Sequence, residues 1–131
     1  MNPDEPERTD PSATTLFHVA LPDDWARAAG TGTYGWSTRG VTLEEEGFVH
    51  GAHRHQLDGV VERFYADVEE LAILVVDRDL LTAPVVDEPP ADGVDELFPH
   101  VYGPIPVAAV VRVVQWRAAD GVAPSVAVAS G

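Results

Sequence analysis

Residues 71–76, LAILVV in one-letter code, decide the fold class of this chain. The run is too short for a typical helix, contains three β-branched residues and has no polar residue in alternation. Those properties predict a central strand that is buried on both faces. Such a strand needs apolar cover on each side, and the rest of the chain has to supply it.

The strongest helical signal lies just before this run. Apolar residues from Leu57 to Phe64 recur at i, i+3, i+4 and i+7, which predicts a helix over about residues 52–65. Its apolar side is expected to face the core. Its polar side is expected to include Gln56 and Arg63.

The chain before this helix predicts one more helix and one more strand. A proline and two acids open residues 22–30 and a glycine closes them, as in a short helix. Residues 16–21 are apolar and end at that proline, which favours a buried first strand. The Gly- and Thr-rich residues 31–46 predict a strand or loop excursion anchored by Tyr34 and Trp36.

The remaining strands are expected to be short. Residues 47–51 and 84–87 each predict a brief one. Residues 97–104 are apolar but interrupted by prolines, which favours an edge or irregular strand near a site over a central one. Residues 110–116 alternate and predict a half-exposed terminal strand. About six strands and two helices, both early in the chain, indicate an α+β fold made mainly of sheet.

The two ends of the chain differ from its middle. Residues 1–15 contain three prolines and no large apolar side chain beyond Met1, so burial cannot repay the entropy of ordering them. Residues 118–131 lack aromatic side chains and a regular period. We therefore expect a single domain over residues 16–117 between a disordered acidic tail and a flexible Ala/Val-rich tail.

The composition argues against several classes of protein. Eight arginines stand against 22 acidic residues, and lysine is absent, so the formal net charge is −14. This balance disfavours binding to nucleic acid or to an anionic membrane. No apolar run approaches the roughly 18 residues of a membrane span, and the first residues do not resemble a signal peptide, so a cytoplasmic location is expected. The absence of cysteine removes disulfides, thiolate metal sites and a cysteine nucleophile.

Three histidines within six residues, His50, His53 and His55, invite a metal-site interpretation. Without cysteine, and with His53 and His55 pointing apart on a helix, no metal site is predicted there. The competing interpretation places His53 and His55 in solvent at the start of the helix. His50 differs, because a histidine inside an apolar strand must be hydrogen-bonded or must line a cleft.

Residues 95–104 form a second polar cluster, which includes Glu96, His100 and Tyr102 on a backbone stiffened by two prolines. His100 and Tyr102 are two residues apart, so in an extended segment their side chains leave the same face and can engage one ligand. The alternative is that Tyr102 and Phe98 are core aromatics with a polar group at one end.

His18 lies midway along the expected first strand. It is either a core histidine whose nitrogens are satisfied by the protein, or a neutral donor and acceptor in a cleft. Polar groups in apolar strands are hard to satisfy, so we expect several of them to share one concave surface. The residues expected to converge there are His18, His50, His100 and Tyr102.

Six segments in chain order carry a family resemblance. They are FHV at 17–19, EGFVH at 46–50, the pattern QLxxVxxRFY with its spacing at 56–65, LxVD at 74–77, EP at 88–89 and ELFPHVYGPI at 96–105. Together they resemble the domain of unknown function 952 family of bacterial and plant proteins, and the last segment is the most specific. The sequence departs from the family at Gly51 and Ala52, where the family has small hydroxyl or thiol side chains.

The resemblance implies a fold related to the ADP-ribosyltransferases, with split, mainly antiparallel sheets that grip NAD in a cleft between them. On this basis His18 would contact the nicotinamide ribose or amide. Glu96 would stabilise the positive charge that develops when the glycosidic bond breaks. The implied catalytic residues are His18, His50, His100 and Glu96, and the implied ligand-binding residues are Phe48, Tyr102, Arg54 and Arg63.

Three functions follow as hypotheses. The first is an ADP-ribosyltransferase-like enzyme, a transferase or glycohydrolase, that uses NAD or an NAD derivative as substrate. The second is a module that binds a small molecule or a partner in the same cleft without catalysis. The third is a metalloenzyme that depends on His50, His53 and His100.

Overall fold

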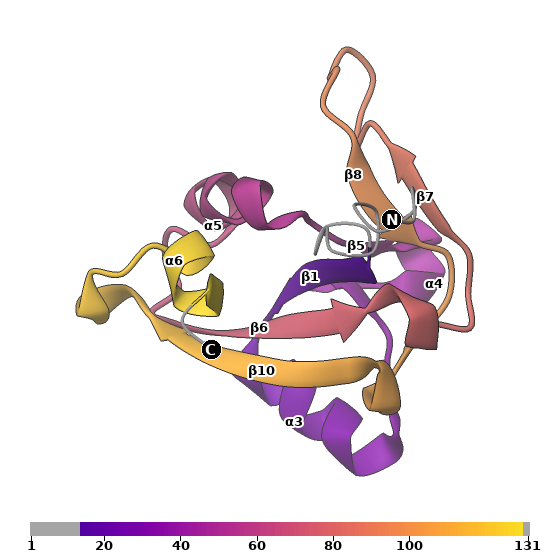
Figure 1. Cartoon of the computed structure of the whole chain (residues 1–131), viewed down its shortest axis with the longest axis horizontal. Helices are drawn as coiled ribbons and strands as arrows, with labels where there is room; N and C mark the ends of the chain where they lie inside the picture. Colours follow the sequence, from indigo (N-terminus) through magenta and orange to yellow (C-terminus); the bar gives the residue numbers. More distant parts are fainter. Residues whose placement is uncertain (1–13, 130–131) are drawn as a thin grey trace, which may run out of the picture.

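The longest strands pair into one antiparallel sheet in the order β1-β6-β10 (Figure 1). They are β1 (Thr15–Ala20), β6 (Glu70–Asp77) and β10 (Val110–Arg117). The structure is a computed structural model and describes residues 14–129. The predicted central strand at residues 71–76 is confirmed as the core of β6, and β10 is the predicted terminal strand.

Strand β6 is apolar from Leu71 to Val76 because both faces of this sheet are covered. Alternate side chains of β6 enter two different apolar clusters. One cluster includes Ala28 of α3 (Pro22–Thr31), the predicted first helix, and the other includes Val61 of α5 (Leu57–Phe64). Figure 1 shows α3 on one side of the sheet and α5 on the other.

A second antiparallel sheet has the order β5-β8-β7, from β5 (Val49–His50), β8 (Phe98–Val101) and β7 (Val85–Glu88). The prediction of an edge or irregular strand at residues 97–104 is therefore wrong, because β8 is the middle strand. Strand β5 pairs only with the last two residues of β8, so the missing N–H of Pro99 does not interrupt that ladder.

A backbone bridge joins the two sheets. Phe17 of β1 and Ala52 exchange two backbone hydrogen bonds of 2.8 Å each. This pairing makes Ala52 extended and delays the predicted helix of residues 52–65. The chain instead passes through a 3-10 turn (Arg54–Gln56) before α5 begins at Leu57.

Small two-stranded pairs complete the fold. Strand β2 (Thr33–Tyr34) pairs with β9 (Ile105–Pro106), and β3 (Trp36–Thr38) pairs with β4 (Val41–Thr42) ahead of the short α4 (Leu43–Glu46). The architecture is α+β with several small antiparallel sheets, as predicted. No helix within residues 14–129 is long and apolar enough to cross a membrane.

The C-terminal segment differs from the flexible tail expected at residues 118–131. Pro124–Ala129 forms helix α6, and its Val128 is buried against the α5 side of the first sheet. Asp58 of α5 accepts hydrogen bonds from the backbone N (2.8 Å) and the hydroxyl (2.7 Å) of Ser125. The disordered tail expected at residues 1–15 lies largely outside the described residues.

We expect Val128→Thr to lower the melting temperature by about 5 °C, because burying a hydroxyl in place of a methyl group costs about 1 kcal/mol in a domain of this size. Ala129→Ser, at an exposed neighbouring position, should leave it unchanged. Thermal unfolding followed by circular dichroism measures both. Equal melting temperatures for the two variants would show that α6 contributes nothing to stability.

Candidate functional site

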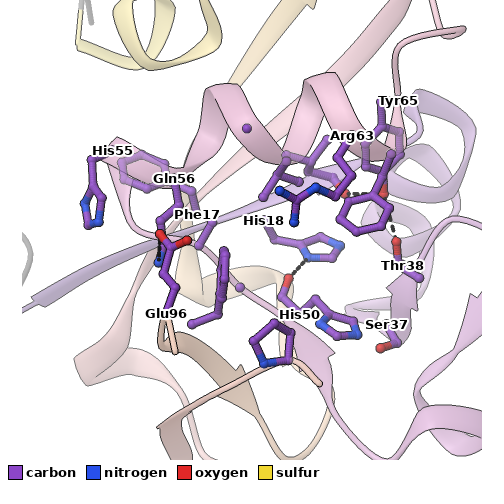
Figure 2. Close-up of a pocket in the computed structure, with 18 residues that line it drawn as sticks. Phe17, His18, Ser37, Thr38, His50, His55, Gln56, Arg63, Tyr65 and Glu96 are labelled. Atoms are coloured by element: carbon purple, nitrogen blue, oxygen red, sulfur yellow. Dashed lines mark hydrogen bonds between the residues drawn. The ribbon is translucent and has the colours of Figure 1, made fainter. Parts of the chain in front are cut away.

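A cavity of about 330 Å³ lies where the two sheets meet, between β1, β3, β5, β8 and α5 (Figure 2). Its apolar wall consists largely of aromatic rings, from Phe17, Phe64, Tyr65 and Phe98. Cavities of this size hold a small organic ligand. The polar groups around it decide which ligand it can accept.

His18 is one of these groups, but the protein already satisfies both of its ring nitrogens. Its Nδ1 lies 2.6 Å from the backbone oxygen of His50, which can only accept, so Nδ1 carries the proton. Its Nε2 therefore accepts from the Tyr34 hydroxyl at 2.9 Å. Burial lowers the pKa of His18 to about 4, so the ring is neutral. The core-histidine interpretation fits these contacts better than a direct bond to a ligand.

His50 also lines the cavity, and its surroundings differ from those of His18. Its ring is half-buried, and within residues 14–129 it has ring contacts but no hydrogen bond to either nitrogen. Burial is the main cause that lowers the pKa of His50, and the neighbouring His100 lowers it further. A neutral imidazole with free nitrogens can accept a proton from a bound hydroxyl.

Glu96 lies at the mouth of the cavity and is held there by Gln56 (Figure 2). The Gln56 amide nitrogen donates to a Glu96 carboxylate oxygen at 3.0 Å and to the Leu97 carbonyl at 2.8 Å. The other end of the same amide accepts from the His53 backbone N at 2.9 Å. Gln56 was predicted on the exposed face of the helix, and this is wrong: it is buried and positions Glu96.

The two arginines predicted to bind ligand have different surroundings. Arg63 of α5 lines the cavity, and within the described residues it has neither an ion pair nor a hydrogen bond. Arg54 does not line the cavity, because its Nε donates to the Ser125 carbonyl at 2.8 Å and ties α6 to the start of the helix. The expected ligand contact from Arg54 is therefore replaced by a structural one.

The predicted convergence of the histidines on one surface holds only in part. His18 and His50 line the same cavity, whereas His100 lines a separate hollow with Phe48. The His50 and His100 rings meet edge to face, with centroids 5.1 Å apart, so they form the boundary between the two. Tyr102 is exposed and lines neither of them.

His100 and Tyr102 do share a partner, as their spacing predicted, but it is a residue of the protein. Nδ1 of His100 lies 2.8 Å from a carboxylate oxygen of Glu88, which also accepts from the Tyr102 hydroxyl. The Phe48 ring stacks on His100 with centroids 4.0 Å apart. Sequence analysis missed Glu88, although it lies in one of the family segments. Only the pairing of β7 with β8 brings it to His100.

Ser37 is a second residue that sequence analysis missed. It is fully buried, lines the cavity, and its hydroxyl has no hydrogen-bond partner. The alternation of β3 places it on the inner side of the strand. A buried hydroxyl without a partner costs free energy unless a ligand or water satisfies it, so Ser37 marks the polar end of the cavity.

The histidines at residues 53 and 55 do not join this site as a metal cluster. Within the described part of the chain, no three His, Cys, Asp or Glu side chains are placed to hold a metal ion. His53 and His55 stack on each other, with ring centroids 5.9 Å apart, and His53 Nε2 lies 3.6 Å from Asp87.

A family model for "Protein of unknown function (DUF952)" matches residues 19–113. The chain belongs to this family. The match contains every strand and helix that lines the cavity except the first residues of β1. In a search of curated proteins, none matched this chain.

Three solved structures of one protein, CC0527 from Caulobacter crescentus, share the fold. The crystal structure and that of a double mutant each have a TM-score of 0.66 and 22% identity, covering 78% of this chain and 85% of CC0527. The solution NMR structure has a TM-score of 0.62 and 21% identity, covering 79% and 83%. At this identity the likeness concerns the fold of the DUF952 domain.

Proposed function

We propose that this DUF952 protein binds NAD or an NAD derivative in the cavity and transfers or hydrolyses its ADP-ribose part, as ADP-ribosyltransferase-like enzymes do. The observation that carries the proposal is a cavity at the junction of two antiparallel sheets, walled by aromatic rings, with a carboxylate at its mouth. Its volume suits the nicotinamide riboside end of the ligand, with the rest outside.

The polar groups of the cavity suit both the nicotinamide ring and the phosphate of such a ligand. A pyridinium ring between aromatic side chains gains stacking energy, and its positive charge is compatible with Glu96. Arg63 is the cation free to meet a phosphate, and it extends from α5 toward the cavity (Figure 2). Ser37 supplies a hydroxyl for the amide or the sugar.

The proposed reaction breaks the bond between nicotinamide and ribose. Nicotinamide leaves with the bonding electron pair, and the positive charge that remains on the ribose is stabilised by the Glu96 carboxylate. An attacking water or acceptor hydroxyl forms the new bond to the ribose carbon and gives its proton to neutral His50. His18 is a positioning residue here, because its Nδ1 holds the His50 backbone.

We expect Glu96→Gln to reduce the release of nicotinamide from NAD at least tenfold, because the amide keeps the shape of the side chain and removes its charge. Loss of one electrostatic stabiliser commonly costs about 10²-fold or more, so tenfold is a lower bound. Chromatography of free nicotinamide measures the rate. Asp95→Asn, at the exposed neighbouring residue outside the cavity, is the matched control and should retain full activity.

A module that binds without catalysis is the second candidate. It is favoured by Gly51 and Ala52, which replace the family's hydroxyl or thiol side chains beside His50. In that case NAD or ADP-ribose would raise the melting temperature, and the rise would fall in an Arg63→Gln variant, while no nicotinamide appears. Absence of both stabilisation and nicotinamide release would exclude NAD as the ligand.

A further inference from the structure

A second hollow, of about 450 Å³, lies on the other side of the His50 and His100 rings from the cavity. It is bordered by Glu46 at the end of α4, by Phe48, by Glu88 of β7 and by the loop that carries Asp92. The proposed reaction uses none of these four residues. A ligand of the hollow would therefore contact residues that the proposed reaction does not use.

Among the described residues, three carboxylates and no arginine line this hollow: Glu46, Glu88 and Asp92. Within residues 14–129, Glu46 and Asp92 form no ion pair or hydrogen bond. The hydrogen bond from the Tyr102 hydroxyl is the main cause that lowers the pKa of Glu88, and the hydrogen bond with His100 is the next. The Glu88 carboxylate therefore stays ionised. Within residues 14–129, the negative charge at the hollow is thus not neutralised by arginine.

His100 gives independent evidence that a hydrogen-bond donor is missing at the hollow. The ring is 1% exposed and lines the hollow, and its Nε2 is buried and has no hydrogen-bond partner among the described residues. Its Nδ1 faces a Glu88 oxygen that only accepts, so Nδ1 donates. In the neutral ring Nε2 is then an acceptor that lacks a donor, and such orphaned buried atoms are rare in proteins.

The side chains at the hollow are complementary to one kind of ligand. The carboxylates accept hydrogen bonds, as does the free nitrogen of His100, and no lining side chain donates a free N–H or O–H. The Phe48 ring adds a π-surface that attracts cations. An anion or a neutral acceptor would find no donor among these side chains.

We propose that this hollow is a binding site for an organic cation whose head donates hydrogen bonds, a guanidinium or an alkylammonium group. The same head occurs on free small amines and guanidines and on arginine or lysine side chains of another protein. The experiment below distinguishes these two sources.

The test titrates the full chain with methylguanidinium and, separately, with N-methylurea, which has nearly the same shape and no charge. Amide signals in two-dimensional NMR at about pH 8, where an ordinary histidine is neutral, report the binding site. We expect methylguanidinium to shift the signals of Phe48, Glu88 and Asp92 in a saturable manner. Equal effects of the two compounds, or no saturable shift with methylguanidinium, would overturn the proposal.

Two double variants separate a local site from general attraction to an acidic protein. Glu46→Gln with Asp92→Asn should raise the Kd for methylguanidinium at least fivefold. Glu44→Gln with Asp95→Asn changes the net charge equally at exposed residues outside the hollow, and should leave the Kd unchanged. Equal weakening in both would show that the long-range field alone attracts the cation. All four positions are exposed, so neither variant removes a core contact.

A short Gly-Arg-Gly peptide with capped ends identifies the source of the cation. If the peptide binds at least tenfold more tightly than methylguanidinium, the site recognises an arginine side chain of a protein. If methylguanidinium binds as well as the peptide, a free small cation suffices. Either result supports the proposed cation-binding site. They do not depend on NAD, so a failure of the proposed reaction remains distinguishable.

Discussion

The variant His18→Ala should unfold at a temperature more than about 10 °C below that of the wild type, a loss of about 3–5 kcal/mol. The substitution leaves the buried Tyr34 hydroxyl and the His50 carbonyl without their partner, and it opens a void between the two sheets. Each buried polar group that loses its hydrogen bond costs about 1–3 kcal/mol, and the void adds to that.

Chemical denaturation of two further variants tests whether the loss of stability comes from the hydrogen bonds and packing of His18. Tyr34→Phe removes only the hydroxyl and should cost about 1–2 kcal/mol. His55→Ala removes an exposed histidine and should stay within about 0.5 kcal/mol of the wild type. If His18→Ala instead melts like the wild type but no longer responds to NAD, His18 contacts the ligand and the structural role is wrong.

Acid should destabilise the protein through the same histidine. The pKa of His18 falls from an ordinary 6.5 to about 4, chiefly because burial disfavours the charged ring. Between these values the unfolded chain binds a proton at this residue that the folded chain does not. The free energy of unfolding is therefore lost as the pH falls through this window, by about 3 kcal/mol in total from His18.

The difference between wild type and His18→Gln isolates this contribution from those of the carboxylates. Urea denaturation at several pH values between about 7 and 4 should give a flatter dependence for the variant. His50 should add to the fall, because burial and His100 also lower its pKa. Parallel curves for wild type and His18→Gln would show that the His18 ring is protonated as readily in the folded protein as in the unfolded chain.

The main elements of the fold could be predicted because their signals are local. The apolar run at residues 71–76 and the helical period from Leu57 to Phe64 appear as β6 and α5. The start of α5 could not be predicted, because Ala52 is held by Phe17, a residue distant in the sequence. Helix α6 was missed because its small side chains give no strong period, and it is stabilised by contacts with Asp58 and the first sheet.

Sequence analysis named several residues that line the cavity, but it did not predict correctly which of them lie together. Glu96 and Arg63, which only the family resemblance implied, line the cavity. Of the four residues expected to share one concave surface because polar groups in apolar strands need partners, His18 and His50 line it together and Tyr102 does not. His100 was expected with them but lies beyond His50, in the second hollow. Whether a histidine lines the cavity or the second hollow depends on the register between β5 and β8. A single sequence does not specify that register.

The sequence by itself determined the α+β class, the central strand, the two main helices and the excess of acidic residues, because hydrophobic period and charge are properties of neighbouring residues. Only the tertiary structure decided which polar groups are already satisfied. His18 forms hydrogen bonds with Tyr34 and His50, and Arg54 forms one with Ser125. The side chains of His50 and Arg63 form none within residues 14–129. The partners are 16 to 71 residues apart in the chain, and long-range packing alone brings them within hydrogen-bonding distance.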